Sequence, residues 1–271
     1  MFVGVDGCRA GWFAVKLTDG FKWDLGVFED IKTLWTNLHY SAVILIDIPI
    51  GLRDSGTDER ECDIEARKIL GNKRAPSVFR APSRKAVYSP KGKASDTNYD
   101  LTKKRLPLQT LNILPKIKEV DALLSKDKSV RLVIKEIHPE ICFWALSGHH
   151  SMPYSKKKKE GFFERKRILQ SIYAETENIV DKALTVYRRR NVARDDILDA
   201  LAAAVTAKMG FGRFLTLPEK PPVDSKGLHM EMVYYVPVLV SQACGWDVHL
   251  RSEVSRRMSS IKSCHVKKYS M

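Results

Sequence analysis

The fold is decided at the start of the chain, in residues 1–28, which read MFVGVDGCRAGWFAVKLTDGFKWDLGVF. The first apolar run and the β-type residues at 11–18 predict two strands. The Asp-Gly pair at 19–20 is typical of a hairpin turn, so residues 21–28 are predicted to return as a third strand. The chain is therefore expected to open as an antiparallel meander.

Further strands are expected later in the chain. Residues 42–48, AVILIDI, form a near-continuous aliphatic run that suits a central strand buried on both faces, and residues 131–137 predict another. The spacing of apolar residues predicts helices at 29–40, 58–70, 101–125, 139–146, 161–188 and 192–209. An antiparallel opening followed by strands that helices separate favours an α/β fold, in which a mixed sheet carries helices on both faces.

Residues 53–128 are expected to form an insertion of helices and loops in this domain. Within it, residues 72–90 are rich in Arg, Lys, Pro and Ser, and a loop of that length in a compact domain is usually functional. The helical stretch 101–125 is predicted to break at Pro107 and Pro115, because proline lacks the backbone donor that a helix interior needs.

The composition indicates a polyanionic partner. The chain has 271 residues, and 46 Lys and Arg against 32 Asp and Glu give a formal charge of +14. Nucleic acid, either DNA or RNA, is the first candidate for such a surface. The longest apolar runs are far short of a membrane span, so no membrane partner is expected. The oligomeric state, a homodimer included, is left open.

The cysteines and the first residues bear on the compartment. The five cysteines are widely spaced and form no CxxC motif, which argues against a disulfide framework or a zinc site. The first residues lack the charged and apolar regions of a signal peptide. Both observations favour a reducing cytoplasm.

Carboxylates stand where strands end and where a helix begins. Asp6 ends the first strand, Asp47 lies near the end of the central strand, and Glu136 ends the strand at 131–137. Asp196 and Asp199 open the helix at 192–209 and share one of its faces. Because the carboxyl ends of parallel strands meet at one edge of a sheet, these acids are expected to converge there.

Such a group of acids requires a cation, since crowded carboxylates repel one another. Their hard oxygens suit Mg²⁺ or Mn²⁺, and two such ions can activate water and stabilise the leaving oxygen of a phosphodiester. Each acid also has a simpler interpretation. Asp6 could be a turn residue, Glu136 could pair with a lysine, and Asp196 could cap its helix. Asp47 is harder to dismiss, because an acid inside an aliphatic strand is costly unless it is paired, protonated or metal-bound.

Basic residues near these acids are candidates for binding phosphates. The candidates are Arg9, Arg80, Arg84, Lys85 and His138. Two basic runs, Lys156 to Lys159 and Arg188 to Arg190, could serve the same purpose or form a solvated surface.

Several segments of the chain have a familiar form: VGVDGCRAGW (3–12), LIDIPIGL (45–52), SVFRAPSR (77–84), EIHPEICFWALSG (136–148) and DDILDALAAAVTA (195–207). In these segments the chain resembles the domain-of-unknown-function family 429, whose members are predicted ribonuclease H-like nucleases. The resemblance implies a ribonuclease H-like fold with a metal-dependent site. It also implies one domain over residues 1–235, with residues 236–271 as a C-terminal extension.

The stretch DDILDA is also similar to the last acidic motif of Holliday-junction resolvases, in which two aspartates three residues apart open the final helix. That similarity implies that Asp196 and Asp199 are the pair and that Asp6 is the first-strand aspartate. Asp47 and Glu136 both remain candidates for the middle acid.

Three functions are compatible with these patterns. The first is a nuclease that hydrolyses phosphodiesters with Mg²⁺ or Mn²⁺ held by the five acids. The second is a nucleic-acid-binding protein without catalysis, which the same basic surface would serve. The third is a phosphotransferase, because the turn at residues 6–11 is similar to the phosphate-contacting hairpin of actin-like ATPases and sugar kinases. No second glycine-rich hairpin is present for that third function.

Overall fold

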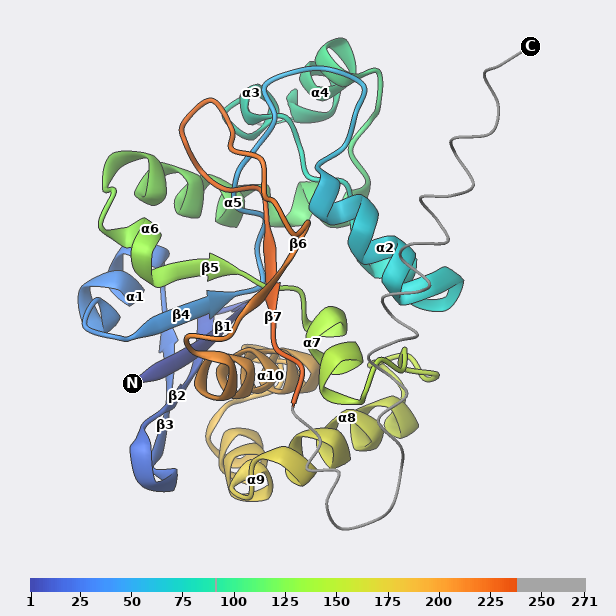
Figure 1. The fold of residues 1–271 in the computed structure, drawn as a ribbon. Helices are drawn as coiled ribbons and strands as arrows, with labels where there is room; N and C mark the ends of the chain where they lie inside the picture. The colour runs from blue at the N-terminus through green and yellow to red at the C-terminus, as the bar shows by residue number, and fades with distance from the viewer. Residues whose placement is uncertain (91, 238–271) are drawn as a thin grey trace. The chain divides into compact units, whose positions relative to one another are not determined.

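A five-stranded mixed sheet forms the centre of the computed structural model, which describes residues 1–90 and 92–237 (Figure 1). Its strands are β1 (Phe2–Cys8), β2 (Gly11–Leu17), β3 (Trp23–Phe28), β4 (Val43–Ile46) and β5 (Ile134–Glu136). Their order is β3-β2-β1-β4-β5, with β1, β2 and β3 antiparallel and β1, β4 and β5 parallel. The predicted α/β class and the antiparallel opening are confirmed, and the arrangement is consistent with a ribonuclease H-like fold.

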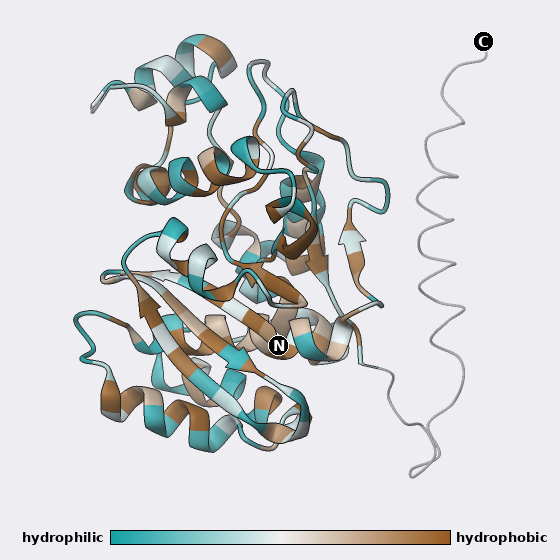
Figure 2. Ribbon diagram, turned by 90° about the vertical axis from the view of Figure 1, so that its left-hand side faces the viewer, coloured by the Kyte–Doolittle hydropathy of each residue, from teal (hydrophilic) through white to brown (hydrophobic). Residues whose placement is uncertain are grey.

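Helices cover both faces of the sheet, as the sequence predicts. Alternate side chains of a strand point to opposite faces, so Leu45 belongs to one buried cluster while Ile44 and Ile46 belong to another. The helices of the first cluster are α7 (Pro139–Leu146), α8 (Lys159–Ile172), α9 (Thr176–Val186) and α10 (Arg194–Gly210). The second cluster is formed mainly by α1 (Ile31–Leu38) and α5 (Leu108–Lys126), with single residues from two short helices described below. The strands between them are largely hydrophobic (Figure 2).

Helix α10 lies unusually close to β1, and a glycine makes this possible. A Cβ added to Gly4 would lie 2.1 Å from both the Ala200 oxygen and the Ala204 nitrogen, so only glycine fits there. The facing side of α10 is rich in alanine and fully buried. This contact fixes the start of α10 beside the carboxyl end of β1 and therefore sets the geometry of the candidate site.

The segment between β4 and β5 contains α2 (Glu61–Arg74), α3 (Arg84–Val87), α4 (Ala94–Thr102), α5 and α6 (Val130–Val133). The predicted break at Pro115 is wrong, because α5 continues through it. Ile117, Val120 and Leu124 are buried after the proline, and their packing keeps the helix intact. The helical turn α6 takes the place of the first part of the strand predicted at 131–137.

The single helix predicted at 161–188 is two helices, α8 and α9, so that prediction is wrong in its continuity. The chain turns at Tyr173, whose side chain is buried against the core, and Thr176 begins the next helix. The turn lets both helices direct an apolar side toward the sheet. A two-stranded sheet of β6 (Leu215–Leu217) and β7 (Met232–Tyr234) follows α10.

No helix among the described residues is long and apolar enough to cross a membrane. The extension predicted at 236–271 lies outside the described residues from 238 onward.

Candidate active site at the carboxyl ends of β1 and β4

Two aspartates follow matched positions on the parallel strands β1 and β4. Val5 pairs with Ile46, and the backbone N–H of Asp47 donates to the Val5 carbonyl at 3.0 Å. Asp6 and Asp47 therefore lie toward the same edge of the sheet, although β1 continues past Asp6 to Cys8 and Asp6 does not end the strand. Asp6 is buried, and its Oδ1 accepts the Gly7 N–H at 2.7 Å. The turn-residue interpretation of Asp6 is wrong, because Asp6 pairs with Phe13 inside β1 and the turn begins only after Cys8.

Helix α10 supplies two more aspartates to this edge. Asp196 lies in its first turn, where Oδ2 accepts the Ala193 N–H at 2.8 Å, so it contributes to the cap of the helix. Asp199 lies one turn further along and is only 1% exposed. The close packing of α10 on β1 at Gly4 brings both side chains toward Asp6.

A lysine from the 147–158 segment reaches into the same place. The Lys156 Nζ lies 2.5 Å from the Asp199 Oδ2, and Asp199 is almost completely buried. The sequence offers Lys156 only as one member of a basic run. Nothing in the run distinguishes it from its neighbours, because the contact depends on how the segment folds back onto α10.

The four aspartates share one electrostatic environment. Burial, followed by the charges of Asp47, Asp199 and Asp196, raises the pKa of Asp6 well above its ordinary value. Burial and the charge of Asp199 raise the pKa of Asp47 to about 8, and burial raises that of Asp196 to about 6. Burial also raises the pKa of Asp199, while Lys156 opposes the rise. The site thus holds more negative charge than one lysine compensates.

The raised pKa of Asp47, caused by burial and then by its acidic neighbours, predicts how stability depends on pH. A native pKa of about 8 for Asp47, against about 4 in the unfolded chain, means that the native state binds more protons between these values. The free energy of unfolding should therefore fall as the pH rises from about 4 to about 8. Asp47→Asn should remove part of this loss and stabilise the protein at pH 8 by at least about 1 kcal/mol. Urea unfolding across this pH range, without divalent cations, measures both effects.

Asp24→Asn is a suitable control for that experiment. Asp24 is exposed, and its pairing with Lys16 lowers its pKa, so the substitution should not stabilise the protein at pH 8. Equal responses of the two variants would contradict the proposed crowding.

The carboxylates fit a divalent cation by chemistry and charge. Hard oxygens from three separate elements converge in a partly desolvated place, and their mutual repulsion would be relieved by a doubly charged ion. As the side chains stand, no three His, Cys, Asp or Glu residues within 1–90 and 92–237 are close enough together to hold a metal ion. Lys156 forms an ion pair with Asp199, so a cation could bind to Asp199 only if that ion pair opened.

Glu136, the other candidate for the middle acid, is held in different contacts. Arg60 donates to both of its carboxylate oxygens at 2.8 Å, and the Ile50 N–H donates to Oε2 at 2.6 Å. Arg60 also binds Asp63 at 2.6 Å, and all three charged side chains are buried. Burial raises the pKa of Glu136 to about 7, although Arg60 opposes the rise. Between the two alternatives, the geometry favours Asp47 as the acid that joins the cluster.

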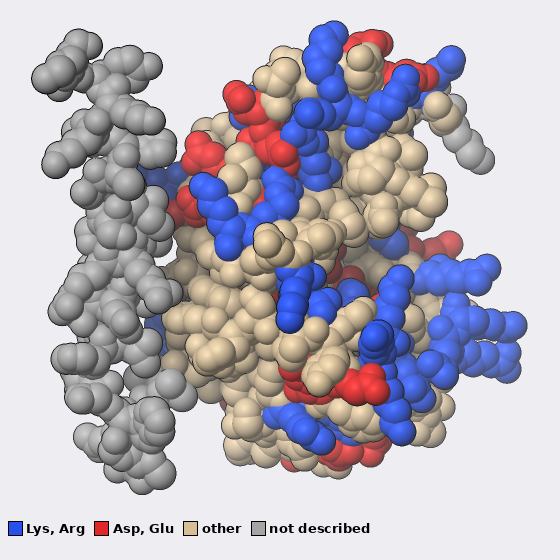
Figure 3. All heavy atoms as spheres, turned by 90° about the vertical axis from the view of Figure 1, so that its right-hand side faces the viewer, with Lys and Arg blue, Asp and Glu red and all other residues tan. Residues whose placement is uncertain are grey.

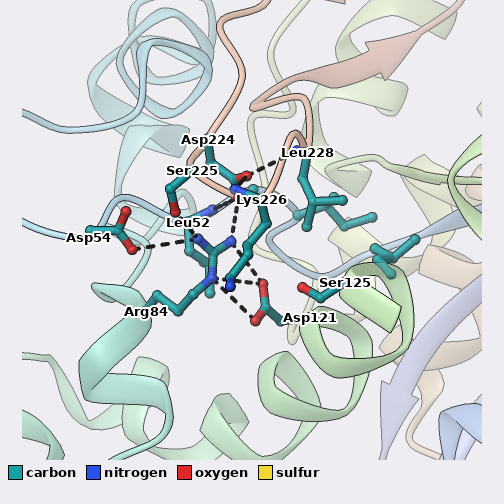
Figure 4. Close-up of polar contacts among 12 residues, drawn as sticks. Leu52, Asp54, Arg84, Asp121, Ser125, Asp224, Ser225, Lys226 and Leu228 are labelled. Atoms are coloured by element: carbon teal, nitrogen blue, oxygen red, sulfur yellow. Dashed lines mark hydrogen bonds and ion pairs between the residues drawn. The ribbon is translucent and has the colours of Figure 1, made fainter. Parts of the chain in front are cut away.

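Arg84, predicted to bind phosphate, is enclosed by acids. Its guanidinium donates to Asp121 at 3.0 Å, to Asp224 and to the Ser225 hydroxyl at 3.0 Å, with Asp54 at 3.6 Å (Figure 4). Asp224 also accepts the backbone N–H groups of residues 52, 226 and 228. These bonds tie the loop after β4 to α5 and to the 224–228 turn. The described contacts of Arg84 are therefore structural.

The other predicted phosphate ligands differ in exposure. Arg80 donates to Glu59 at 2.6 Å, and His138 is turned inward with Nε2 3.3 Å from the Ser77 oxygen. Burial lowers the pKa of His138, so the ring is neutral near pH 7. Lys85 and Arg9 are exposed. Of the five, only Arg9 directly follows β1, at the edge where the aspartates gather.

The run at residues 188–190 lies next to Arg9. The N–H of Ala10 donates to the Asn191 carbonyl at 3.2 Å, which joins the turn after β1 to the loop before α10. Arg188, Arg189 and Arg190 are all exposed in that loop. Exposed arginines therefore border the aspartates on the α10 side.

Comparison with known proteins gives one result. A family described as "Protein of unknown function (DUF429)" matches residues 4–223. No curated protein and no solved structure matches the chain.

Proposed function

The chain belongs to the DUF429 family of proteins of unknown function, and we propose that it is a metal-dependent nuclease that hydrolyses phosphodiester bonds in nucleic acid. One observation carries the proposal. Asp6, Asp47, Asp196 and Asp199 come from three separate elements and gather at one sheet edge, where each has a raised pKa. A protein accepts such repulsion at a functional site more readily than elsewhere.

Each of the four acids has a defined part in this proposal. Asp6, Asp47 and Asp199 would hold Mg²⁺ or Mn²⁺ through their oxygens, and Asp196 would contribute from the first turn of α10. The bound cation would activate the attacking water and stabilise charge on the phosphate. Lys156 pairs with Asp199, and in this proposal a cation would take the place of its ammonium beside Asp199, which would leave the ammonium to contact a phosphate.

The basic surface supports a nucleic-acid substrate. Figure 3 shows lysine and arginine side chains crowded along one part of a face, next to acidic atoms recessed near its middle. Exposed Arg9 and the arginines at 188–190 lie at the edge that carries the aspartates. Contacts of this kind position the phosphate backbone and do not depend on sequence.

A cleavage assay tests the proposal directly. Labelled single-stranded, duplex and branched DNA and RNA are incubated with the protein in Mg²⁺, in Mn²⁺ or in a chelator. Cleavage of at least one substrate is expected with a divalent cation and none with the chelator. Binding should weaken as salt increases, because the arginines release counterions from the phosphates.

A nucleic-acid-binding protein without catalysis is the second candidate. The ion pair between Lys156 and Asp199 favours it, because a lysine already compensates one of the acids. Salt-sensitive binding, with no cleavage in either metal and no heat of metal binding in calorimetry, would replace the nuclease proposal with this one.

A further inference from the structure

A cavity of about 760 Å³ lies between the 147–158 segment and the first turns of α8. It is next to the candidate active site along the chain, because Lys156, which binds Asp199, stands between Tyr154 and Lys159 of the cavity wall. A volume of this size is within the range of small-molecule sites. The nuclease proposal assigns no role to it.

Two aromatic side chains of the cavity wall are available for stacking. Tyr154 is 50% exposed and Phe163 is 42% exposed, so part of each side chain is accessible to a ligand. The Lys159 ammonium lies 5.9 Å from the centre of the Phe163 ring. Aromatic faces beside cations are the pattern with which proteins bind unpaired bases, because every base has a π-face.

The polar groups of the cavity suit a nucleotide as well. Lys159 and Arg167 line it and can meet phosphates on either side of a base. Glu164 also lines it, but its Oε2 is buried and lies 4.0 Å from the fully buried Arg165. The two cations, rather than this carboxylate oxygen, are therefore the polar groups that a nucleotide would meet.

The wall of the cavity is held firmly by side chains behind it. Arg165 is fully buried and donates to the carbonyls of Tyr154 and Gly161 and to Glu140. Arg74 donates to the Met152 carbonyl at 2.7 Å, which ties the segment to α2. A preformed wall reduces the cost of ordering that binding would otherwise incur.

We propose that this cavity receives one unpaired base of a nucleic-acid strand, stacked on Tyr154 and Phe163, while the backbone of that strand passes the acidic site. The inference rests on the proposed function for the identity of the ligand. It predicts a substrate that contains single-stranded or displaced nucleotides, since a base inside a duplex cannot enter such a cavity.

Binding without cleavage tests the inference. Fluorescence anisotropy measures the affinity of the full chain for labelled single strands of about 12 nucleotides, and for duplexes of the same sequence, in a chelator. Tyr154→Ala and Phe163→Ala should each weaken single-strand binding about tenfold, because one stacking face is lost. Duplex binding should change less than about twofold in both variants, since duplexes would rely on phosphate contacts alone. A 2-aminopurine in the strand should lose fluorescence on binding the parent protein and regain it with either variant.

Tyr40→Ala is the matched control, because Tyr40 is 68% exposed but lies after α1 and away from the cavity. It should bind single strands like the parent protein. Tyr154→Leu and Phe163→Leu keep apolar bulk without a π-face, and they repeat the test if an alanine variant fails to fold.

The outcomes separate this inference from the nuclease proposal. Unchanged single-strand binding in the Tyr154 and Phe163 variants overturns the cavity assignment, even if the protein cleaves nucleic acid. Equal losses for single strands and duplexes overturn it as well. Selective loss of single-strand binding, in a protein that cleaves nothing with any metal, supports the cavity and removes the nuclease proposal.

Discussion

Asp6→Asn is expected to lower metal-dependent cleavage by about a thousandfold or more. The carboxylate lies at the centre of the acidic cluster, where Asp47, Asp196 and Asp199 all act on its pKa. Asparagine keeps the shape and the bond from the Gly7 N–H but removes the negative charge that would hold a cation. A metal ion contributes several kcal/mol to stabilisation of the transition state, and each 1.36 kcal/mol is tenfold in rate.

The same substitution should not weaken the fold, and this distinguishes loss of catalysis from loss of structure. Removing one of several repelling charges relieves the cluster, so the melting temperature of Asp6→Asn should equal or exceed that of the parent. Calorimetry should show Mn²⁺ binding to the parent and a large loss of affinity in the variant. Asp24→Asn, an exposed acid on β3, is the control for both assays. Full activity of Asp6→Asn and of Asp199→Asn would refute the assignment of the site.

The proximity of the four aspartates could be predicted from the sequence, because it depends on two neighbouring parallel strands and one helix start. The run around Asp47 is aliphatic enough to identify a buried parallel strand, and the strand at Asp6 is equally clear. Parallel strands that share an edge then place both acids together without further information. The pair Asp196 and Asp199 is fixed by helical spacing, and Gly4 allows the close approach of that helix.

The parts that could not be predicted depend on contacts between segments far apart in the chain. Lys156 reaches Asp199 only because its segment folds back over α10. The basic run in the sequence does not predict this contact. Glu136 ends a strand as the aspartates do, yet a guanidinium 76 residues earlier takes both of its oxygens. Arg84 likewise lies in a basic segment that predicts a phosphate ligand, but its ion pairs with Asp121 and Asp224 hold parts of the fold together.

Arg60→Met should destabilise the protein more than any substitution at the surface. Its guanidinium bridges Glu136 and Asp63, and the side chains of all three residues are at most 3% exposed. Methionine of similar length would leave two buried carboxylates without their charged partner, which costs about 3–5 kcal/mol. For a domain of this size the melting temperature should fall by about 6–20 °C, as differential scanning calorimetry would measure.

Arg105→Met provides the control, since Arg105 pairs with Asp96 while both side chains are more than half exposed. Water screens a pair of that kind, so it contributes little and the melting temperature should change little. Adding Glu136→Gln to Arg60→Met should restore part of the lost stability, because one of the two buried carboxylates left without Arg60 is then neutral.

Glu136→Gln alone then decides between the two candidates for the middle acid. If Glu136 serves the fold through Arg60, the variant should lose stability but bind Mn²⁺ with nearly unchanged affinity, since its oxygens are already taken. Asp47→Asn should do the reverse, gaining stability at pH 8 and losing Mn²⁺ affinity, because the Asp47 carboxylate is one of the aspartates that repel one another in the cluster. If Glu136→Gln lost Mn²⁺ affinity while Asp47→Asn kept it, Glu136 and not Asp47 would be the middle acid of the metal site. Arg60 would then have to release Glu136 when the cation binds.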